Sequence, residues 1–412
     1  MARLKGFQEL TPVIEALNKF FGILKLKRLN TAFIPVEKAL GQVTAKEIIA
    51  QTNLPPFNRS AVDGYALKAK DTIEASQFHP KTLSLIEKEV VEEREAKETW
   101  TGNAIPEGAD AVVMLEHTKK TDDGIEVIVS LTPGANVSKK GEDVEKGKIV
   151  MGAGVRLTPY DLGLLAALGM EKVEVVRKPK AAILATGSEL VALGDNLKPN
   201  QIVEVNSIIL SGMCAELRVE AFSLGIAKDD ENEIREKINE GLAEADMVIT
   251  TGGTSVGIHD LVPKILEQIE PHSVVVHGIA MRPSMPTALA VVHKKPVIIL
   301  SGNPVAAVIG FEVFARPLIQ KLLGTKNEER VKLRAKLTRR VAGVLGLRVF
   351  LRVKLVEKDG EFLAEPIRVK GSSIITTMTK ANGYVIIPED REGLRKDEVV
   401  TVHLFGTVTG EK

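Results

Sequence analysis

Between residues 178 and 324 the sequence alternates between short apolar stretches and longer amphipathic ones, and this alternation is its strongest constraint on the fold. The apolar stretches, most clearly AAILAT, MVITT and VIILS, predict buried strands, and the segments between them predict helices. Strands separated by helices in this way pair in parallel through right-handed crossovers. We therefore predict a doubly wound α/β sheet covered by helices.

Helix starts in this region are marked by capping residues. Ser207 is expected to cap one helix, and Asp229-Asp230 with Glu233 form a capping box for the next. Asn303-Pro304 is expected to open a long helix that ends at Leu323, because proline suits the first helical position.

The flanking sequence has other periodicities, so we divide the chain into four domains. Thr11-Pro12 opens an amphipathic helix that ends near Arg28, and Thr158-Pro159 opens another. Short alternating stretches bounded by Gly, Pro and Asn predict strands elsewhere. The predicted domains are a discontinuous helical N-terminal and linker domain (1–49 and 146–177), a mostly β domain (50–145), the α/β domain (178–326) and a C-terminal β domain (327–412).

Composition excludes several classes of protein. Lys and Arg number 55 against 54 Asp and Glu, so no overall field attracts nucleic acid or acidic membranes. The chain has no signal peptide and no apolar run near the ~20 residues that span a bilayer, which predicts a cytoplasmic protein. The single cysteine, Cys214, excludes an internal disulfide and a clustered-cysteine zinc site. Few Gln and many Lys, Glu and Arg indicate a heat-adapted source.

Glycine-rich and polar segments follow three of the predicted central strands, at residues 187–189, 252–260 and 302–304. Ligands of an open α/β sheet bind at the carboxyl ends of its strands, so these segments are expected to meet at one edge. Successive backbone amides of GGTSVG can form a nest for phosphate oxygens, and a helix begins at the third segment. We expect a phosphorylated ligand, although a tight turn and a helix cap without any ligand would have the same sequence.

Acidic residues gather at the same edge. Glu189, Asp229 and Asp260 follow predicted strands, and carboxylates beside phosphate are the usual ligands of Mg²⁺. Helix capping alone would also explain Asp229. Arg282, in the proline-stiffened segment MRPSMP, could provide positive charge for an anion or could be a solvated turn residue.

Seven motifs, in order along the chain, resemble the molybdopterin molybdenumtransferase family, which includes the C-terminal part of gephyrin. They are PPFNRSAVDGYA, TGNAIPEGADAVV, KKGEDVEKG, ATGSELV, TTGGTSVGIHD, MRPSMPT and SGNPVAA. The resemblance covers essentially the whole chain. It implies a four-domain homodimer with a C-terminal β-barrel, and an α/β domain shared with molybdopterin adenylyltransferases.

The resemblance also implies a reaction, namely insertion of molybdate into adenylylated molybdopterin with Mg²⁺-dependent release of AMP. The family's functional acids and threonine match Asp63, Thr101, Asp143, Glu189, Asp229 and Asp260. Three of these, Glu189, Asp229 and Asp260, are the expected metal ligands. The residues expected to bind substrate are Thr186, Gly187, Ser188, Gly252, Gly253, Ser255, Gly257, Arg282, Ser301, Gly302, Asn303, Pro304, Arg352 and Ser372.

Arg282, Arg352 and Ser372 are expected to receive the molybdate dianion through charge-assisted hydrogen bonds. The chain departs from many relatives at three positions, where Met285, Ala306 and Leu347 replace lysine, serine and arginine. These changes leave open whether molybdate or tungstate is the substrate.

Asp63, Thr101 and Asp143 lie far in sequence from the other site residues, so a dimer interface is expected to unite the two groups. Two alternatives belong to other classes. The first is a non-catalytic molybdopterin-binding scaffold, and the second is a nucleotide hydrolase that shares the α/β domain. The hydrolase would leave the motifs of the mostly β domain unexplained. A molybdopterin adenylyltransferase is the expected supplier of substrate.

Overall fold

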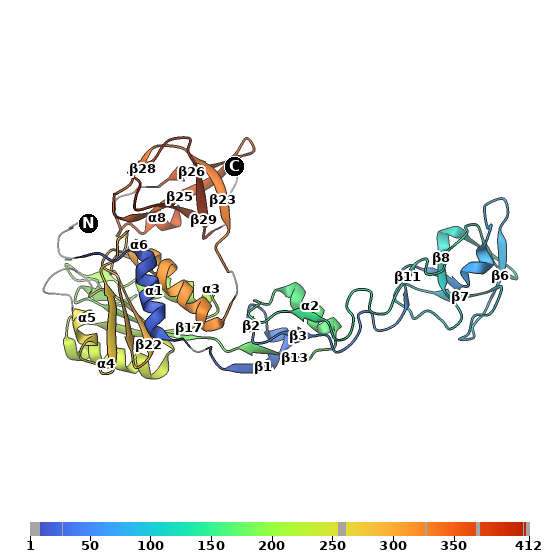
Figure 1. Ribbon diagram of the computed structural model, residues 1–412, viewed down its shortest axis with the longest axis horizontal. Helices are drawn as coiled ribbons and strands as arrows, with labels where there is room; N and C mark the ends of the chain where they lie inside the picture. Colours follow the sequence, from blue (N-terminus) through green and yellow to red (C-terminus); the bar gives the residue numbers. More distant parts are fainter. Residues whose placement is uncertain are drawn as a thin grey trace. The chain divides into compact units, whose positions relative to one another are not determined.

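The computed structural model describes residues 9–26, 28–253, 261–325, 328–367, 371–406 and 408. It has two compact units, Met1–Ala32 with Val176–Lys412, and Phe33–Val175. Figure 1 labels their elements. Within the first unit, the α/β sheet and the C-terminal strands have separate hydrophobic cores. The four domain limits stay a prediction.

A six-stranded sheet forms the centre of the α/β region. Its strands, in spatial order, are β17 (Glu220–Ala227), β14 (Lys180–Thr186), β18 (Met247–Thr251), β22 (Lys295–Leu300), β21 (Ala288–Val292) and β19 (His272–His277). The first four are parallel, which confirms the α/β prediction. β21 runs antiparallel to both of its neighbours, β22 and β19, so the expectation of parallel pairing is wrong for this strand. A tight turn at His293-Lys294, both with positive φ, joins β21 to β22 in place of a helical crossover.

Helices pack on this sheet in two groups (Figure 1). One group, α4 and α5, shares a core with β14, β18 and β22, and the other, α3 and α6, packs together against the sheet. The first helix, α1, packs against β19 and β21. The helices are α1 (Val13–Leu24), α3 (Asn206–Glu216), α4 (Glu231–Glu244), α5 (Leu261–Leu266), α6 (Pro304–Gly310) and α7 (Arg316–Leu323).

Several helix ends differ from the predictions. α1 begins after Pro12 without a side-chain cap and ends at Leu24, because Lys25 has a left-handed backbone with φ of 41°. Ser207 does not cap α3; its backbone N–H instead donates to the Glu204 carboxylate at 2.9 Å. The predicted helix through Leu323 is interrupted by a π-helical turn, η4 (Phe311–Ala315).

The cap of α4 matches the prediction only in part. The Asp230 side chain accepts hydrogen bonds from the Asn232 and Glu233 backbones, as expected. The Glu233 carboxylate accepts from the Lys228 N–H and therefore does not close a capping box. Asn303 precedes α6 but makes no side-chain cap bond.

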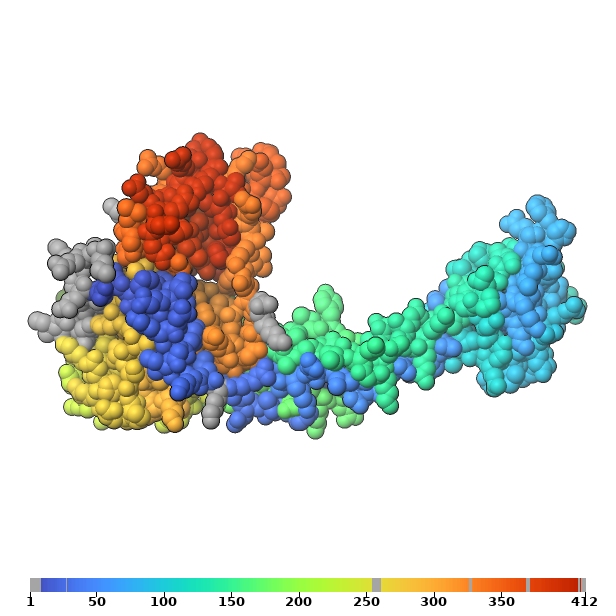
Figure 2. Space-filling model, in the orientation of Figure 1, coloured from blue at the N-terminus to red at the C-terminus, as the bar shows by residue number. Residues whose placement is uncertain are grey.

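The C-terminal strands form a closed five-stranded barrel, which confirms the predicted fold class for this part. The barrel order is β25 (Arg348–Lys358), β26 (Glu361–Pro366), β23 (Lys332–Leu337), β29 (Val399–Leu404) and β27 (Gly383–Ile387), closed by pairing of β27 with β25. β20 (Met281–Arg282) of the α/β region adds to β25 in parallel. Figure 2 shows the barrel, in orange and red, lying directly against the α/β region.

The second unit is mostly β, as predicted for residues 50–145. Its larger sheet has the order β8 (Ala111–Met114), β5 (Gly64–Leu67), β7 (Glu95–Thr99), β6 (Lys81–Leu85), β10 (Gly124–Val127) and β9 (Thr118–Thr121). A smaller sheet contains β1 (Thr31–Pro35), β13 (Lys172–Val176) and β2 (Val43–Thr44). Thr158 caps α2 (Pro159–Ala167) in a capping box with Asp161, which confirms that helix start.

Two-stranded pairs complete the described strands. They are β3 (Ile48–Ile49) with β12 (Ile149–Met151), β4 (Arg59–Ser60) with β11 (Val137–Ser138), β15 (Leu190–Val191) with β16 (Ile202–Val203), and β24 (Val341–Ala342) with β28 (Gly393–Leu394). None of the helices in the described ranges is long and apolar enough to cross a membrane.

Candidate functional site

A cavity of about 560 Å³, here called the rim cavity, lies at the carboxyl ends of β14, β18 and β22. Parallel strands end at one edge of the sheet, so the loops that follow them meet there. Of the predicted residues in these three loops that the structure describes, all but Ser188 line it, and Asp229, which follows β17, lines it as well. The lining residues are Thr186, Gly187, Glu189, Asp229, Gly252, Gly253, Ser301, Gly302, Asn303 and Pro304. Ser255, Gly257 and Asp260 lie outside the described residues.

Glycine is required where the first two loops meet. Gly252 has a φ of 88°, and a Cβ on it would lie 2.3 Å from the carbonyl oxygen of Thr186. Any other side chain would therefore push the loops apart. Gly302 of the third loop also approaches Gly252 closely. The loops thus carry no bulky side chain where they meet, which leaves room for a phosphate group close to the backbone.

Two of the predicted acids are brought together beside Gly187 and Ser188. The Asp229 carboxylate accepts a hydrogen bond from the Ser188 N–H at 3.1 Å, and the Asp229 N–H donates to the Ser188 hydroxyl oxygen at 3.2 Å. The Glu189 carboxylate lies against Gly187, since a Cβ there would be 2.7 Å from Glu189 Oε2. Both acids line the rim cavity.

These carboxylates fit Mg²⁺ as a partner of phosphate rather than as a complete protein site. Within the described ranges, no three His, Cys, Asp or Glu side chains could hold a metal ion together. Mg²⁺ is commonly bound by one or two carboxylates together with phosphate oxygens and water. Glu189 and Asp229, beside loops suited to phosphate, are a donor set of this kind.

Sequence reasoning missed two residues of the rim cavity, Glu204 and Asn206. Both are buried at the start of α3. The Asn206 amide donates to the Gly302 carbonyl oxygen at 2.8 Å and so ties α3 to the third loop. The sequence signal for them is two polar residues just before the predicted helix start at Ser207, and a plain helix start has the same pattern.

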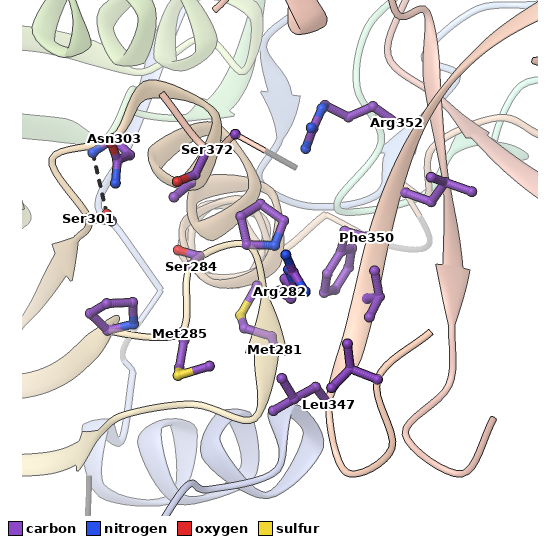
Figure 3. Close-up of a pocket in the computed structure, with 17 residues that line it drawn as sticks. Met281, Arg282, Ser284, Met285, Ser301, Asn303, Leu347, Phe350, Arg352 and Ser372 are labelled. Carbon is purple, nitrogen blue, oxygen red and sulfur yellow. Dashed lines mark hydrogen bonds between the residues drawn. The ribbon is translucent and has the colours of Figure 1, made fainter. Parts of the chain in front are cut away.

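A second cavity of about 430 Å³, here called the arginine pocket, lies between residues 281–286 and the barrel strand β25 (Figure 3). Arg282, Arg352 and Ser372 line it, as do the polar residues Ser284, Ser301 and Asn303. Arg352 is only 3% exposed, and its burial lowers the pKa of the guanidinium. The three positions that depart from many relatives, Met285, Ala306 and Leu347, line the same pocket.

The loop that carries Arg282 has an unusual backbone. Ser284 is buried and has a φ of 81°, in the left-handed region that side chains other than glycine rarely adopt. Its hydroxyl is 2.8 Å from that of Thr287, and Gly310 of α6 leaves the space that the Ser284 hydroxyl occupies. Strained backbone of this kind is concentrated at binding and catalytic sites.

The rim cavity and the arginine pocket adjoin, because Pro286, Ser301 and Asn303 line both. Figure 3 shows Ser301 and Asn303 on one side of the arginine pocket and Arg352 on the other. A single elongated ligand could therefore occupy both cavities.

In the second unit, the structure brings Asp63 and Thr101 together. The backbone N–H and the hydroxyl of Thr101 both donate to Asp63 Oδ1 at 2.8 Å, and these bonds lower the pKa of Asp63. Asp143 lies in a loop whose backbone bonds to Leu54 and Pro55. Backbone bonds also join Ser60 to Asn103, so the three motifs of this unit meet in one loop cluster.

Comparison with known proteins gives the family. Three family models match the chain, a MoeA N-terminal region covering domains I and II over residues 11–169, a probable molybdopterin binding domain over 182–321, and a MoeA C-terminal region, domain IV, over 334–405.

Relatives that align over almost the whole chain point to the same family. The molybdopterin molybdenumtransferase of Bacillus subtilis is 34% identical over 97% of this chain and 95% of its own length. The enzyme of Haemophilus influenzae is 32% identical over 92% of this chain and 95% of its own length. The crystal structure of the molybdopterin biosynthesis MoeA protein of Pyrococcus horikoshii OT3 matches with 34% identity and a TM-score of 0.83, covering 96% of this chain and all of that one. The chain therefore belongs to the molybdopterin molybdenumtransferase family.

Proposed function

We propose that this protein inserts molybdate into adenylylated molybdopterin and releases AMP, with Mg²⁺ bound at the site. The observation that carries the proposal is the adjoining pair of cavities. One has carboxylates and glycine loops suited to a diphosphate, and the other has two arginines suited to an oxyanion. A substrate that carries both a diphosphate and a metal-binding dithiolene needs both environments side by side.

The diphosphate is held at the glycine loops of the rim cavity. The Gly252 and Gly302 loops leave room for phosphate oxygens, and α6 begins directly after the Gly302 loop. Glu189 and Asp229 would hold Mg²⁺, which when bound neutralises the diphosphate and stabilises charge on the leaving phosphate. The Ser188 bonds keep Asp229 oriented in the absence of substrate.

The oxyanion is held in the arginine pocket. Arg282, Arg352 and Ser372 donate charge-assisted hydrogen bonds to it, and burial of Arg352 strengthens its electrostatic attraction because water is excluded. Met285, Ala306 and Leu347 add apolar walls rather than charge. Tungstate has nearly the same size and charge as molybdate, so this pocket is expected to accept both.

The loop cluster that contains Asp63, Thr101 and Asp143 completes the site in a homodimer, where it contributes to the rim cavity of the partner subunit. Exposed apolar residues of the second unit support self-association. Ile49 and Ile149, paired across β3 and β12, are 43% and 58% exposed. We also propose that the protein acts in the cytoplasm and receives its substrate from a molybdopterin adenylyltransferase.

The test is turnover of Glu189→Gln and Asp229→Asn enzymes over a range of Mg²⁺ concentrations. Each variant removes a charge that holds the ion, so we expect at least tenfold lower turnover and a higher Mg²⁺ requirement. Asp230→Asn is the matched control, because asparagine caps a helix as well as aspartate does. Wild-type turnover and Mg²⁺ dependence in both site variants would refute the assignment.

A further inference from the structure

The segment Val203–Asn206 forms a wall of the rim cavity that the proposed chemistry does not use. Glu204 is 9% exposed and Asn206 is 7% exposed. Buried polar side chains are costly to keep unless they are paired in the protein or with a ligand. The contacts of these two residues therefore show what the wall can offer to a bound molecule.

Glu204 is fixed on two sides. Its backbone N–H donates to the Val191 carbonyl oxygen at 2.9 Å, and Oε1 accepts the backbone N–H of Ser207 at 2.9 Å. An ionised carboxylate has about four lone-pair positions on its two oxygens, so the bond from Ser207 leaves acceptor capacity for a ligand. The carboxylate is thus a preoriented acceptor at the cavity wall.

Asn206 adds a second acceptor to this wall. Its Nδ2 donates to the Gly302 carbonyl oxygen at 2.8 Å, which fixes the orientation of the amide. Its Oδ1 is buried and has no hydrogen-bond partner in the part of the chain that the structure describes. A buried acceptor without a donor is unfavourable, so Oδ1 would be stabilised by a donor on a molecule bound against this wall.

A wall of acceptors repels phosphate and attracts N–H groups. The part of the cavity that suits phosphate is the glycine loops, where small residues leave room close to the backbone. We propose that Glu204 and Asn206 recognise the amino-bearing edge of the nitrogen heterocycle at one end of the substrate. This inference rests on the proposed function, because it requires a substrate that has both a phosphate and a heterocyclic end.

Both heterocycles of an adenylylated pterin carry such an edge, namely the 6-amino group of adenine and the 2-amino group of the pterin. The test uses two pairs of probes in which the second member lacks only the amino group, AMP with purine riboside 5′-monophosphate and pterin with 4-hydroxypteridine. Affinities are measured by calorimetry for the nucleotides and by ligand fluorescence for the pteridines. The pair that shows discrimination identifies the ring that Glu204 contacts.

Wild-type protein is expected to bind the amino-bearing member of one pair at least about tenfold more tightly, as hydrogen bonds to a charged acceptor allow. Glu204→Gln keeps an oxygen for the Ser207 N–H but adds an N–H donor, so the preference should disappear or reverse. If Glu204 had only a structural role, the substitution would lower the affinity for both members of the pair by the same factor. Glu236→Gln, on the exposed side of α4, is the control and should keep the wild-type ratio.

Equal affinity for both members of each pair in the wild-type protein would overturn the inference, as would an unchanged ratio in Glu204→Gln. If that protein still released AMP from adenylylated molybdopterin in the presence of molybdate, the proposed function would stand. If the wild-type protein bound none of the four compounds and released no AMP, the inference and the proposed function would both fall.

Discussion

Neutralising Glu312 should destabilise the first unit strongly. This side chain lies in the π-helical turn η4 and is 3% exposed. It accepts hydrogen bonds from Arg316 on the same helix, at 2.8 and 3.0 Å, and from Arg330 before the first barrel strand, at 2.6 and 3.2 Å. One carboxylate thus joins the end of the α/β region to the start of the barrel.

The size of the expected loss in unfolding free energy follows from the burial of the Glu312, Arg316 and Arg330 side chains. Breaking a buried ion pair costs about 3–5 kcal/mol because the remaining charge loses its partner. The Arg316 and Arg330 side chains are 13% and 20% exposed, so their guanidinium groups can regain some hydration. For Glu312→Gln, which keeps the shape of the side chain, we therefore expect a loss near the lower limit, about 3 kcal/mol of unfolding free energy.

The assay is urea unfolding followed by two signals. Far-ultraviolet circular dichroism reports both units, whereas the single tryptophan, Trp100, reports only the unit Phe33–Val175. We expect Glu312→Gln to shift the circular dichroism transition and to leave the Trp100 transition in place. Glu329→Gln removes an exposed partner of Lys332 and should change the unfolding free energy by less than about 0.5 kcal/mol.

The pH dependence provides a second check. Burial favours the neutral acid, but hydrogen bonds from Arg330 and Arg316 outweigh it and lower the pKa of Glu312. A carboxyl whose pKa is lower in the folded state stabilises the protein above its unfolded pKa, and this contribution is lost as pH falls through the folded pKa. The difference between wild type and Glu312→Gln should therefore shrink in acid. An unmoved circular dichroism transition in the variant at neutral pH would refute the reasoning.

Three further predictions concern the site. Gly252→Ala should weaken AMP binding at least tenfold by calorimetry, because its Cβ would lie 2.3 Å from the Thr186 carbonyl oxygen; Gly194→Ala, which has a similar positive φ but open space, should bind AMP normally. Asp63→Asn keeps an oxygen for Thr101, so the circular dichroism spectrum should be unchanged while turnover falls at least tenfold; wild-type turnover would remove Asp63 from the site. Arg352→Gln should raise the molybdate concentration needed for half-maximal turnover at least tenfold, since a buried charge is lost, and an unchanged requirement would place the oxyanion elsewhere.

Local sequence patterns could predict the parallel strands and the loops that end them. β14 and β18 are short apolar runs followed by glycine, and each signal lies within ten residues. The same reasoning missed β21, a buried apolar run that is followed by His293-Lys294 rather than by glycine. It also predicted the wrong cap for α3. Ser207 has a side chain that suits a cap, but in the structure its backbone N–H donates to the carboxylate of Glu204, three residues earlier.

The parts of the site that depend on distant contacts could not be predicted from local patterns. Asn206 gains its place through a bond to Gly302, which is 96 residues away. Arg352 reaches the arginine pocket because β25 pairs with β20, and no local pattern predicts that pairing. Only the family resemblance points to Arg352 as a residue that binds substrate. Asp63 and Thr101 are 38 residues apart in sequence but hydrogen-bond to each other, and likewise only their motifs point to them.

The most direct test of the central claim is release of AMP from adenylylated molybdopterin by the purified protein with Mg²⁺. The reaction is run with molybdate, with tungstate and with neither oxyanion. We predict release that depends on an oxyanion and is supported by both. Release without either oxyanion would contradict the claim and favour a nucleotide hydrolase, whereas bound but unconverted substrate under every condition would contradict it in favour of a scaffold.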